Sequence, residues 1–464
     1  MRTLSSKQER PFGLASTQRW VKYHTFHNPL IYPKHQHGFI VQRLSLANTT
    51  TTFFLLCWAG KHPVKKQRRF HKEYQMDKKI EPAGTDEGLI TPEALAEIKS
   101  RIGQRLRIAE VGNELASRET ITRFARGAGD TNPLWNDEEY ARKTRYGCLV
   151  APPSWLYSVI GAGAQQGLRG VHGFHAGDDW EFYRPVLIND CIKAEEFLRG
   201  IEEKPSSFAG KMVIERRERL YHNQRNDLVA KAKGWIIRTE RVTARKEGKY
   251  LKVKLPHPWT ETELKNIEQE VLGEKIQGRQ VRYWEDVSVG ERLPTCIKGP
   301  LGVTDEMAFI AGNGGLYLRA HRSALAEYTK HPAWAFRDSV TSALEPMSAV
   351  HYNLNAARAA GLPYPYAVGV QMNSWKINLL TNWIGDEGWL KKCYCEYRHF
   401  VYLSDAVWLH GKVTRKYVDE NQEYCVDIET DGVNQREENV LPGHSTVILP
   451  SRKAGTWPLL KRLE

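Results

Sequence analysis

An internal duplication constrains the fold of this chain more than any other feature of its sequence. The spacing from Trp135 to Arg142 recurs from His351 to Arg358, and in each copy a glycine and a proline-rich turn follow. The copies lie about 215 residues apart, which is far longer than a solenoid repeat and is the size of a domain. A chain of 464 residues supports two or three domains. The sequence therefore predicts two related domains in tandem.

The duplication continues beyond these motifs. Glu181 and Asp190 are separated by the same spacing as Glu396 and Asp405. The same order of features, repeated at the same interval, indicates two copies of one domain rather than two chance matches.

Helix signals occupy matching places in the two copies. Thr91 is followed by proline at the first helical position, and Thr260 is followed three residues later by Glu263, as in a capping box. Later in each copy an apolar stretch follows the proline-rich turn, at residues 154–161 and 369–384. We expect a lead-in helix and a central apolar helix in each copy.

Strand signals follow the central apolar stretches. Apolar side chains alternate with polar ones in residues 180–186 and again in residues 407–413, which is the period of a half-buried strand. A long apolar helix beside a mainly antiparallel sheet is an α+β arrangement. The expected fold class is therefore α+β.

A carboxylate, an amide and a proline turn precede a short helix in the first copy. The run Gly-Asp-Thr-Asn-Pro-Leu-Trp contains Asp130, Asn132, Pro133 and Trp135. Residues 137–143 then carry acids in the first turn and bases in the last, which suits the helix dipole. The run resembles the hydratase signature of MaoC-like enoyl-CoA hydratases and dehydratases, except that Trp135 stands where that family has its catalytic histidine.

The resemblance covers roughly residues 90–450 and implies a tandem, or double, hot-dog fold, in which antiparallel sheets wrap around central helices. It implies a dehydratase domain like that of fatty acid synthase, also called the MaoC-like N-terminal domain, followed by a diverged second hot-dog. The expected boundaries are a first domain at 76–245, a linker with the lead-in helix at 246–280, and a second domain at 281–464.

In MaoC-like enzymes, as the resemblance implies, an Asp/His pair transfers protons and a backbone N–H near the start of the central helix binds the thioester oxygen. Here that pair is divided between the copies. The first copy keeps Asp130 but has Trp135, and the second has His351 but Pro346 opposite Asp130. Neither copy alone contains the whole pair.

Three explanations of the divided pair stay open. His351 works with a different acid, or Asp130 works with another partner, or the protein only binds acyl thioesters. The alternative acids for the first explanation are Glu345, Glu327 and Asp338. We expect His351 to be the principal catalytic residue and Asp130 to be secondary or structural. The expected substrate-binding residues are Asn132, Trp135, Gly369 and Tyr366.

Other patterns that invite a metal or cofactor are better explained by packing. Cys393 and Cys395 are two residues apart, so a strand would place both thiols on one face, where core packing is expected. His172 and His175 invite a metal site as well, but we expect them to lie in a loop. The sequence predicts no metal and no cofactor. Seven scattered cysteines predict a reducing compartment, which we take to be the cytoplasm.

The formal charge of +13 is concentrated near the N-terminus. Residues 1–75 carry 13 Lys and Arg against 2 Asp and Glu, whereas residues 76–464 carry 54 against 52. The body of the protein is thus nearly neutral, and the charge is no argument for a nucleic-acid partner. We expect the leader to be disordered or absent from the mature protein, with Met76 as the start, and we expect no membrane span.

The expected function is an acyl-CoA hydratase or dehydratase without cofactors, acting on an acyl-CoA thioester. A hot-dog thioesterase and a non-catalytic acyl-CoA-binding subunit are the alternatives. A homodimer, or an assembly with another hot-dog subunit, is the expected oligomer. The aromatic side chains of the insertion at 313–345 suggest a bulky or branched acyl pocket, although surface packing explains them equally well; they are Tyr317, Tyr328, Trp334 and Phe336.

Overall fold

The structure is a computed structural model that describes residues 88–163, 168–206, 210–240, 253–315 and 318–463. The chain divides into two units, and the described residues all belong to the second unit, Lys78–Glu464. The expectations for residues 1–75 and for Tyr317 concern residues outside this described part.

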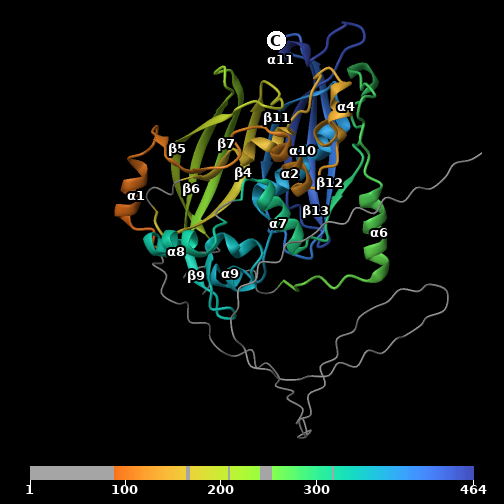
Figure 1. Ribbon diagram of the computed structural model, residues 1–464. Coiled ribbons are helices and arrows are strands. Elements are labelled where there is room, and N and C mark those ends of the chain that lie inside the picture. Colours follow the sequence, from red (N-terminus) through yellow and green to blue (C-terminus); the bar gives the residue numbers. More distant parts are fainter. Residues whose placement is uncertain (1–87, 164–167, 207–209, 241–252, 316–317, 464) are drawn as a thin grey trace, which may run out of the picture. The chain divides into compact units, whose positions relative to one another are not determined.

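A ten-stranded antiparallel sheet runs through the second unit (Figure 1), in the order β1-β5-β6-β7-β4-β11-β14-β13-β12-β8. Its strands are Arg105–Leu106 (β1), His172–Phe182 (β4), Lys193–Ser206 (β5), Gly210–His222 (β6), Leu228–Thr239 (β7), Cys296–Lys298 (β8), Trp389–Glu396 (β11), Val407–Val418 (β12), Tyr424–Asn434 (β13) and Gly443–Ile448 (β14). Two short pairs lie outside this sheet: Ile108–Val111 (β2) with Ile160–Gly163 (β3), and Ala335–Arg337 (β9) with Leu344–Pro346 (β10).

Helices connect and cover these strands. The α-helices are Pro92–Lys99 (α1), Arg118–Gly127 (α2), Pro133–Asn136 (α3), Glu138–Arg142 (α4), Glu261–Leu272 (α6), Val303–Gly312 (α7), His321–Lys330 (α8), Leu354–Ala359 (α9), Gly369–Ile384 (α10) and Leu460–Leu463 (α11). The 3-10 helices are Pro153–Ser158 (η1), Trp284–Asp286 (η2), Pro332–Trp334 (η3) and Met347–His351 (η4).

The strand order is symmetric about the centre of the sheet. There β4 of the first copy pairs with β11 of the second, with Trp180 opposite Cys393 and Asp178 opposite Cys395. Outward from this seam, β4-β7-β6-β5-β1 on one side matches β11-β14-β13-β12-β8 on the other. This α+β arrangement is a tandem hot-dog fold, so the predicted fold class is confirmed.

The duplicated Glu-to-Asp spacing leads to a turn that is the same in both copies. The backbone N–H of Leu187 donates to Asp190 at 2.8 Å, and that of Tyr402 donates to Asp405, also at 2.8 Å. Each aspartate thus holds the turn that precedes the first long strand after the seam, β5 in one copy and β12 in the other.

The predicted lead-in helices are confirmed. Thr91 caps α1 by accepting from Ala94 N, and Thr260 with Glu263 forms a capping box at the start of α6. The predicted helix over residues 154–161 is wrong, because these residues form the short η1 and then enter β3. Glycines in β3 disfavour a helix there, and pairing with β2 supplies the backbone hydrogen bonds instead.

The second copy does contain its central helix. All residues of α10 from Gln371 to Ile384 are buried, including polar ones such as Asn373 and Lys376. Lys376 donates to the Tyr394 carbonyl oxygen at 2.5 Å, which ties the helix to β11. The two copies therefore differ most in their central helix, which is present in one and reduced to η1 in the other.

The helices α2 and α7, one from each copy, approach closely at their C-terminal glycines. A Cβ added to Gly127 would lie 2.5 Å from the Ala308 carbonyl oxygen, and one added to Gly312 would lie 2.7 Å from that of Arg123. Phe124 and Phe309 pack between the same helices with ring centroids 5.9 Å apart. The glycines allow backbone to meet backbone at this crossing.

We expect Gly127→Ala to destabilise the protein by about 1–3 kcal/mol, because the new methyl group overlaps the backbone of α7 and the helices must separate. Thermal unfolding followed by circular dichroism measures the loss. Gly200→Ala is the matched control, because a Cβ there would lie 3.9 Å from Arg216 Cβ, at ordinary contact distance. Equal melting temperatures for both variants and the wild type would contradict the close crossing.

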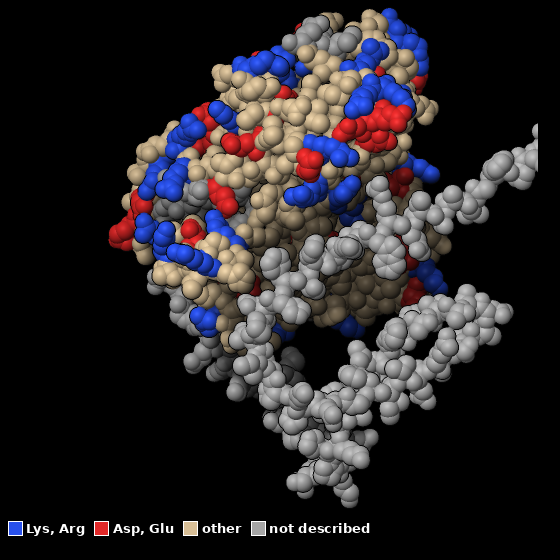
Figure 2. All heavy atoms as spheres, in the orientation of Figure 1, with Lys and Arg blue, Asp and Glu red and all other residues tan. Residues whose placement is uncertain are grey.

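On the face shown in Figure 2, basic and acidic side chains of the described residues are interspersed. This mixture agrees with the near balance of charges in residues 76–464. Among the described residues, every helix is too short or too polar to cross a lipid bilayer.

Candidate active site

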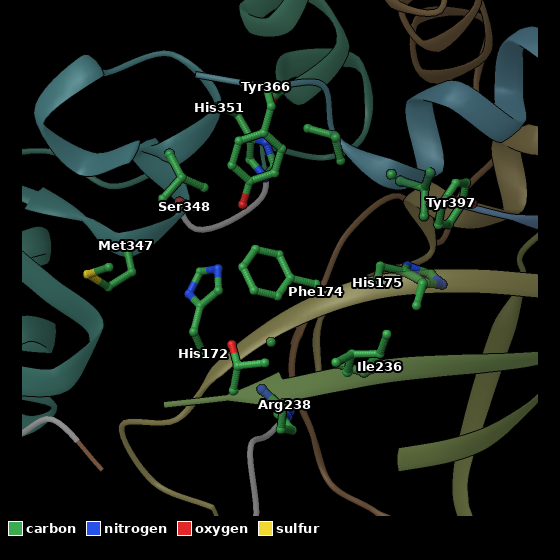
Figure 3. Close-up of a pocket in the computed structure, with 18 of the residues that line it drawn as sticks. His172, Phe174, His175, Ile236, Arg238, Met347, Ser348, His351, Tyr366 and Tyr397 are labelled. Atoms are coloured by element: carbon green, nitrogen blue, oxygen red, sulfur yellow. The ribbon is translucent and has the colours of Figure 1, made fainter. Parts of the chain in front are cut away.

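A cavity of about 650 Å³ lies over the inner face of β4–β7 (Figure 3). The first copy has only the six-residue η1 where the second copy has the 16-residue α10, so this part of the sheet is left uncovered. Both copies line the cavity: the first with β4–β7 and η1, the second with η3, η4 and residues 366–370 and 397–401. Its volume is in the range that holds a small organic ligand.

His351 lines this cavity at the end of η4. Its Nδ1 lies 2.7 Å from the Tyr366 carbonyl oxygen, which can only accept, so Nδ1 carries the proton and Nε2 has the lone pair. Burial lowers the pKa of His351 to about 4. The imidazole is therefore neutral at pH 7 and able to accept a proton at Nε2.

Tyr366 and Gly369 line the same cavity as His351. The ring of Tyr366 packs edge-on against His351 with centroids 4.9 Å apart, and burial raises the pKa of its hydroxyl (Figure 3). Gly369 is the first residue of α10. Backbone N–H groups in the first turn of a helix have no partner within that helix, and they favour negative charge.

The acids considered as partners of His351 lie elsewhere. Asp338 accepts hydrogen bonds from Asn353 and Asn355 and from two backbone N–H groups of its own turn. Glu327 lies 3.7 Å from His331, and Glu345 is part of β10. Among the described residues, the lining of the cavity includes none of these three acids.

A histidine–aspartate pair does lie at the cavity. His175 Nε2 is 2.9 Å from Asp178 Oδ1, and the His175 side chain is 20% exposed while Asp178 is fully buried. Burial by itself would raise the pKa of Asp178, but the charge and hydrogen bond of His175 hold it below its ordinary value. His175 and His172 lie in β4, so their prediction as loop residues is wrong.

The second carboxylate oxygen of Asp178 also accepts hydrogen bonds. Oδ2 accepts from the hydroxyls of Tyr157 at 2.9 Å and Tyr397 at 2.8 Å. The Tyr157 hydroxyl accepts in turn from Trp180 Nε1 at 2.8 Å and from Asn373 Nδ2 at 2.6 Å. The aspartate is thus held by side chains from both copies.

Buried ion pairs form another wall of the cavity, on β5–β7. Arg217 Nη2 lies 2.6 Å from Glu215 and its Nη1 lies 3.3 Å from Glu196. Arg238 also pairs with Glu215 at 2.7 Å, and Arg219 pairs with Glu196 at 3.0 Å. Buried ions require partners of this kind, so the wall is polar although it faces the interior.

Sequence reasoning did not assign the His175–Asp178 pair or the ionic wall to a site. A signal for the wall was present in β6, where Glu215, Arg217 and Arg219 alternate on one face of the strand. Charged residues on the inner face of a strand indicate that no apolar helix covers it. His175 is only three residues from Asp178, but the other partners of Asp178, Tyr157 and Tyr397, lie 21 and 219 residues away, so no local pattern marks the site as a whole.

The first-copy motif lies away from the large cavity. Asn132 and Trp135 line a separate cavity of about 50 Å³, which is far smaller than an acyl thioester. Asp130 is buried, and its Oδ1 accepts from Asn132 N at 3.1 Å within the turn. The structure therefore does not bring Asp130 and His351 into one cavity, and their roles in catalysis stay a prediction.

Side chains of the second copy close off the space that this motif faces. Lys298 donates to the Gly129 carbonyl oxygen and to Asn378 Oδ1, both at 2.8 Å, and lies 3.6 Å from Glu274. Asn378 belongs to α10, so the central helix of the second copy occupies this space. These contacts give the Asp130 turn a structural role between α10 and β8.

Burial raises the pKa of Asp130 to about 6 from an ordinary value of 3.8. Ionisation of Asp130 therefore costs folding free energy, and this cost grows as the pH rises from 3.8 towards 6. We expect Asp130→Asn to remove this cost, so that the unfolding free energy of the variant relative to the wild type rises by roughly 2 kcal/mol between pH 4 and pH 7. Urea unfolding at both pH values tests this, and a constant difference would contradict it.

Two further expectations can be compared with the structure. Cys393 and Cys395 are both fully buried in the core, as predicted. Of the aromatic side chains in the insertion, Tyr328 and Trp334 line the large cavity, while Phe336 belongs to a neighbouring apolar cluster.

The fold and the cavity define a tandem hot-dog protein with a large pocket that both of its copies line. Residues 100–232 match the family model for the FAS1-like dehydratase domain region. A solved structure of a MaoC-like dehydratase is similar over 76% of this chain and 99% of its own, with a TM-score of 0.51 and 14% identity.

Curated relatives match shorter parts of the chain. A UPF0336 protein of Streptomyces griseus is 28% identical over 122 residues, which is 25% of this chain and 78% of that protein. A probable enoyl-CoA hydratase alpha subunit of Thermomonospora curvata is 26% identical over 160 residues, or 30% of this chain and 50% of that protein. Residues 100–232 thus match a dehydratase-type domain, and the fold of the chain is similar to that of a MaoC-like dehydratase.

Proposed function

We propose that the protein catalyses the reversible addition of water to the double bond of an enoyl-CoA thioester in the 650 Å³ cavity. The observation that carries this proposal is the position of His351. It is neutral, it is held by the Tyr366 carbonyl oxygen, and it lines the same cavity as Gly369 at the start of α10.

In the direction of hydration, His351 accepts a proton from water at Nε2 while the water oxygen adds to the β-carbon. The thioester oxygen gains negative charge, which N–H groups at the start of α10 stabilise, beginning at Gly369. General acid–base catalysis of this kind is worth about 10²–10⁴-fold, and one oxyanion donor about 10²–10³-fold. Tyr366 lies against the ring of His351 and restricts its orientation.

The buried ion pairs in the wall of the cavity affect which acyl group it prefers. Arg217, Arg219, Arg238 and Glu196 all line the cavity. A long alkyl chain packed against this wall would prevent water from solvating these charges, which is unfavourable. We therefore expect a short acyl group, or one with a polar end, to be preferred over a long saturated chain.

A turnover screen tests the proposed function. Crotonyl-CoA, trans-2-dodecenoyl-CoA and an enoyl-CoA with a terminal carboxylate are each incubated with the protein, and the loss of the conjugated enoyl absorbance is followed. Loss of that band with the thioester intact supports hydration. Release of free CoA without prior loss of the band would indicate a thioesterase, and saturable binding without either change would indicate a binding subunit.

We further propose a reducing compartment such as the cytoplasm, because the six cysteines among the described residues are free thiols. The name of the Thermomonospora relative, an alpha subunit, supports assembly with a second hot-dog subunit, and a homodimer is the alternative. Light scattering on the purified chain distinguishes a monomer that needs a partner from a homodimer.

A further inference from the structure

The second-copy motif lacks the carboxylate that would complete its proton-transfer pair. Pro346 occupies the position that corresponds to Asp130. Hydration requires one group that accepts a proton from water and another that donates a proton to the α-carbon. His351 is neutral, so it supplies the acceptor but not the donor.

We propose that His175 supplies the missing donor, with Asp178 as the residue that positions it and stabilises its charge. The inference rests on the proposed function and extends it to a residue of β4 outside the hydratase motif. It makes the site composite, because His351 comes from the second copy and His175 from the first.

His175 lies next to the start of α10. A Cβ added to Gly369 would lie 3.5 Å from His175 Cβ, so the base of the histidine side chain lies against the first residue of the helix. A thioester oxygen bound at the N-terminus of α10 would bring the adjacent α-carbon close to this side chain. Figure 3 places His175 and Tyr397 together at the cavity, in agreement with their ring separation of 5.4 Å.

The local backbone also directs His175 towards the cavity. The pairing of β4 with β7 has a bulge between His175 and Gly177, and bulges re-aim side chains near active sites. Gly177 is required there, because a Cβ would lie 2.0 Å from the Trp235 ring. Because of the bulge, the side chains of β4 do not alternate regularly from His175 to Asp178. His175 lines the cavity, whereas Asp178 is buried outside the lining.

The charge of Asp178 suits a proton donor at His175. Its pKa is held below the ordinary value, so the carboxylate stays ionised, and it lies 2.9 Å from His175 Nε2, where it holds the imidazole in one orientation. Tyr157 and Tyr397 donate to the other oxygen and fix the carboxylate in place. The pair thus resembles a carboxylate that orients a histidine in an acid–base catalyst.

The proposed step conserves protons and electrons. Water transfers a proton to His351 as its oxygen bonds to the β-carbon, and the electrons of the double bond move towards the thioester carbonyl. His175 then gives the proton on its Nδ1 to the α-carbon, while Nε2 keeps its hydrogen bond to Asp178; this step restores the carbonyl and leaves a 3-hydroxyacyl thioester. His351 ends protonated and His175 neutral, and exchange with solvent resets both for the next turnover.

Variants of His175 and Asp178 test the proposal in the full chain, with crotonyl-CoA or whichever thioester of the screen reacts fastest. We expect His175→Ala to lower kcat by about 10²-fold or more with little change in KM. Free imidazole should restore at least part of the rate, since the truncated side chain leaves space for it. His175→Gln should lose the same rate without rescue, because glutamine keeps the hydrogen bond to Asp178 but transfers no proton. Asp178→Asn should lower kcat less.

The partly exposed pair His410 and Asp431 is the matched control. Their Nδ1 and Oδ1 atoms lie 2.8 Å apart on β12 and β13, outside the lining of the cavity, and substitution of either should leave kcat unchanged. A full rate in His175→Gln would overturn the proposal. So would loss of rate in a His175→Ala variant that melts like the wild type but gains nothing from imidazole. If the wild type itself turns over no thioester, the proposed function fails and this inference fails with it.

Discussion

Replacement of His351 by alanine is expected to lower kcat by about 10²-fold or more on the preferred enoyl thioester, with little change in KM. The variant lacks the Nε2 lone pair that accepts the proton from water, whereas the walls that bind the substrate remain. Initial rates followed at the enoyl absorbance give both constants. An unchanged kcat in a folded variant would remove His351 from the reaction.

A second substitution separates chemistry from folding. His351→Asn keeps a side-chain N–H that can donate to the Tyr366 carbonyl oxygen, as Nδ1 does at 2.7 Å, but it has no group that accepts a proton near neutral pH. We expect it to melt closer to the wild type than His351→Ala and to be equally slow. Asp130→Asn should cost less activity, since Asp130 lies outside the lining of the cavity.

Breaking the ionic wall is expected to have the largest effect on stability. Arg217→Met should lower the unfolding free energy by about 3–5 kcal/mol, because Glu196 and Glu215 each lose a partner while they stay buried. Burial by itself would raise the pKa of Glu215, but Arg238 and Arg217 lower it to about 2. Denaturant unfolding at pH 7 measures the loss.

The pH dependence of this variant gives an independent check. A depressed carboxyl pKa contributes stability above its ordinary value of 4.5, and this stability is lost as the pH falls towards 2. Arg217→Met should therefore lose less stability on acidification than the wild type. Arg216→Met is the control, since Arg216 lies on the opposite face of β6, 54% exposed and paired with Glu202; it should cost under about 1 kcal/mol. Equal losses for the two variants would argue against the buried network.

Much of the fold follows from local features of the sequence. The cap at Thr91, the capping box at Thr260 and the alternation in residues 407–413 depend on neighbours a few positions away, and the structure contains each of them. The repeated spacing of motifs indicated two copies, and the sheet is symmetric about β4 and β11. Such features survive in a single sequence because they are satisfied within one helix, strand or turn.

The motif residues could be recognised from the sequence, but their surroundings could not. Asp130 and His351 belong to the corresponding motifs of the two copies, yet Lys298 and Asn378 enclose the turn around Asp130 whereas His351 lines a cavity. In each case the surroundings of the motif are set by the part of the other copy that it faces. The Asp130 turn faces α10, and His351 faces the strands that η1 leaves uncovered.

The sequence by itself thus determined the tandem α+β organisation, the starts of the lead-in helices and the resemblance of the motif to the hydratase signature. Tertiary structure alone decided which motif faces a cavity, and it brought His175 and Asp178 to the residues of η4 and the start of α10. The physical reason is that caps and alternation act over a few residues. A cavity, in contrast, depends on which side chains and helices fill the space between two copies about 215 residues apart in the chain.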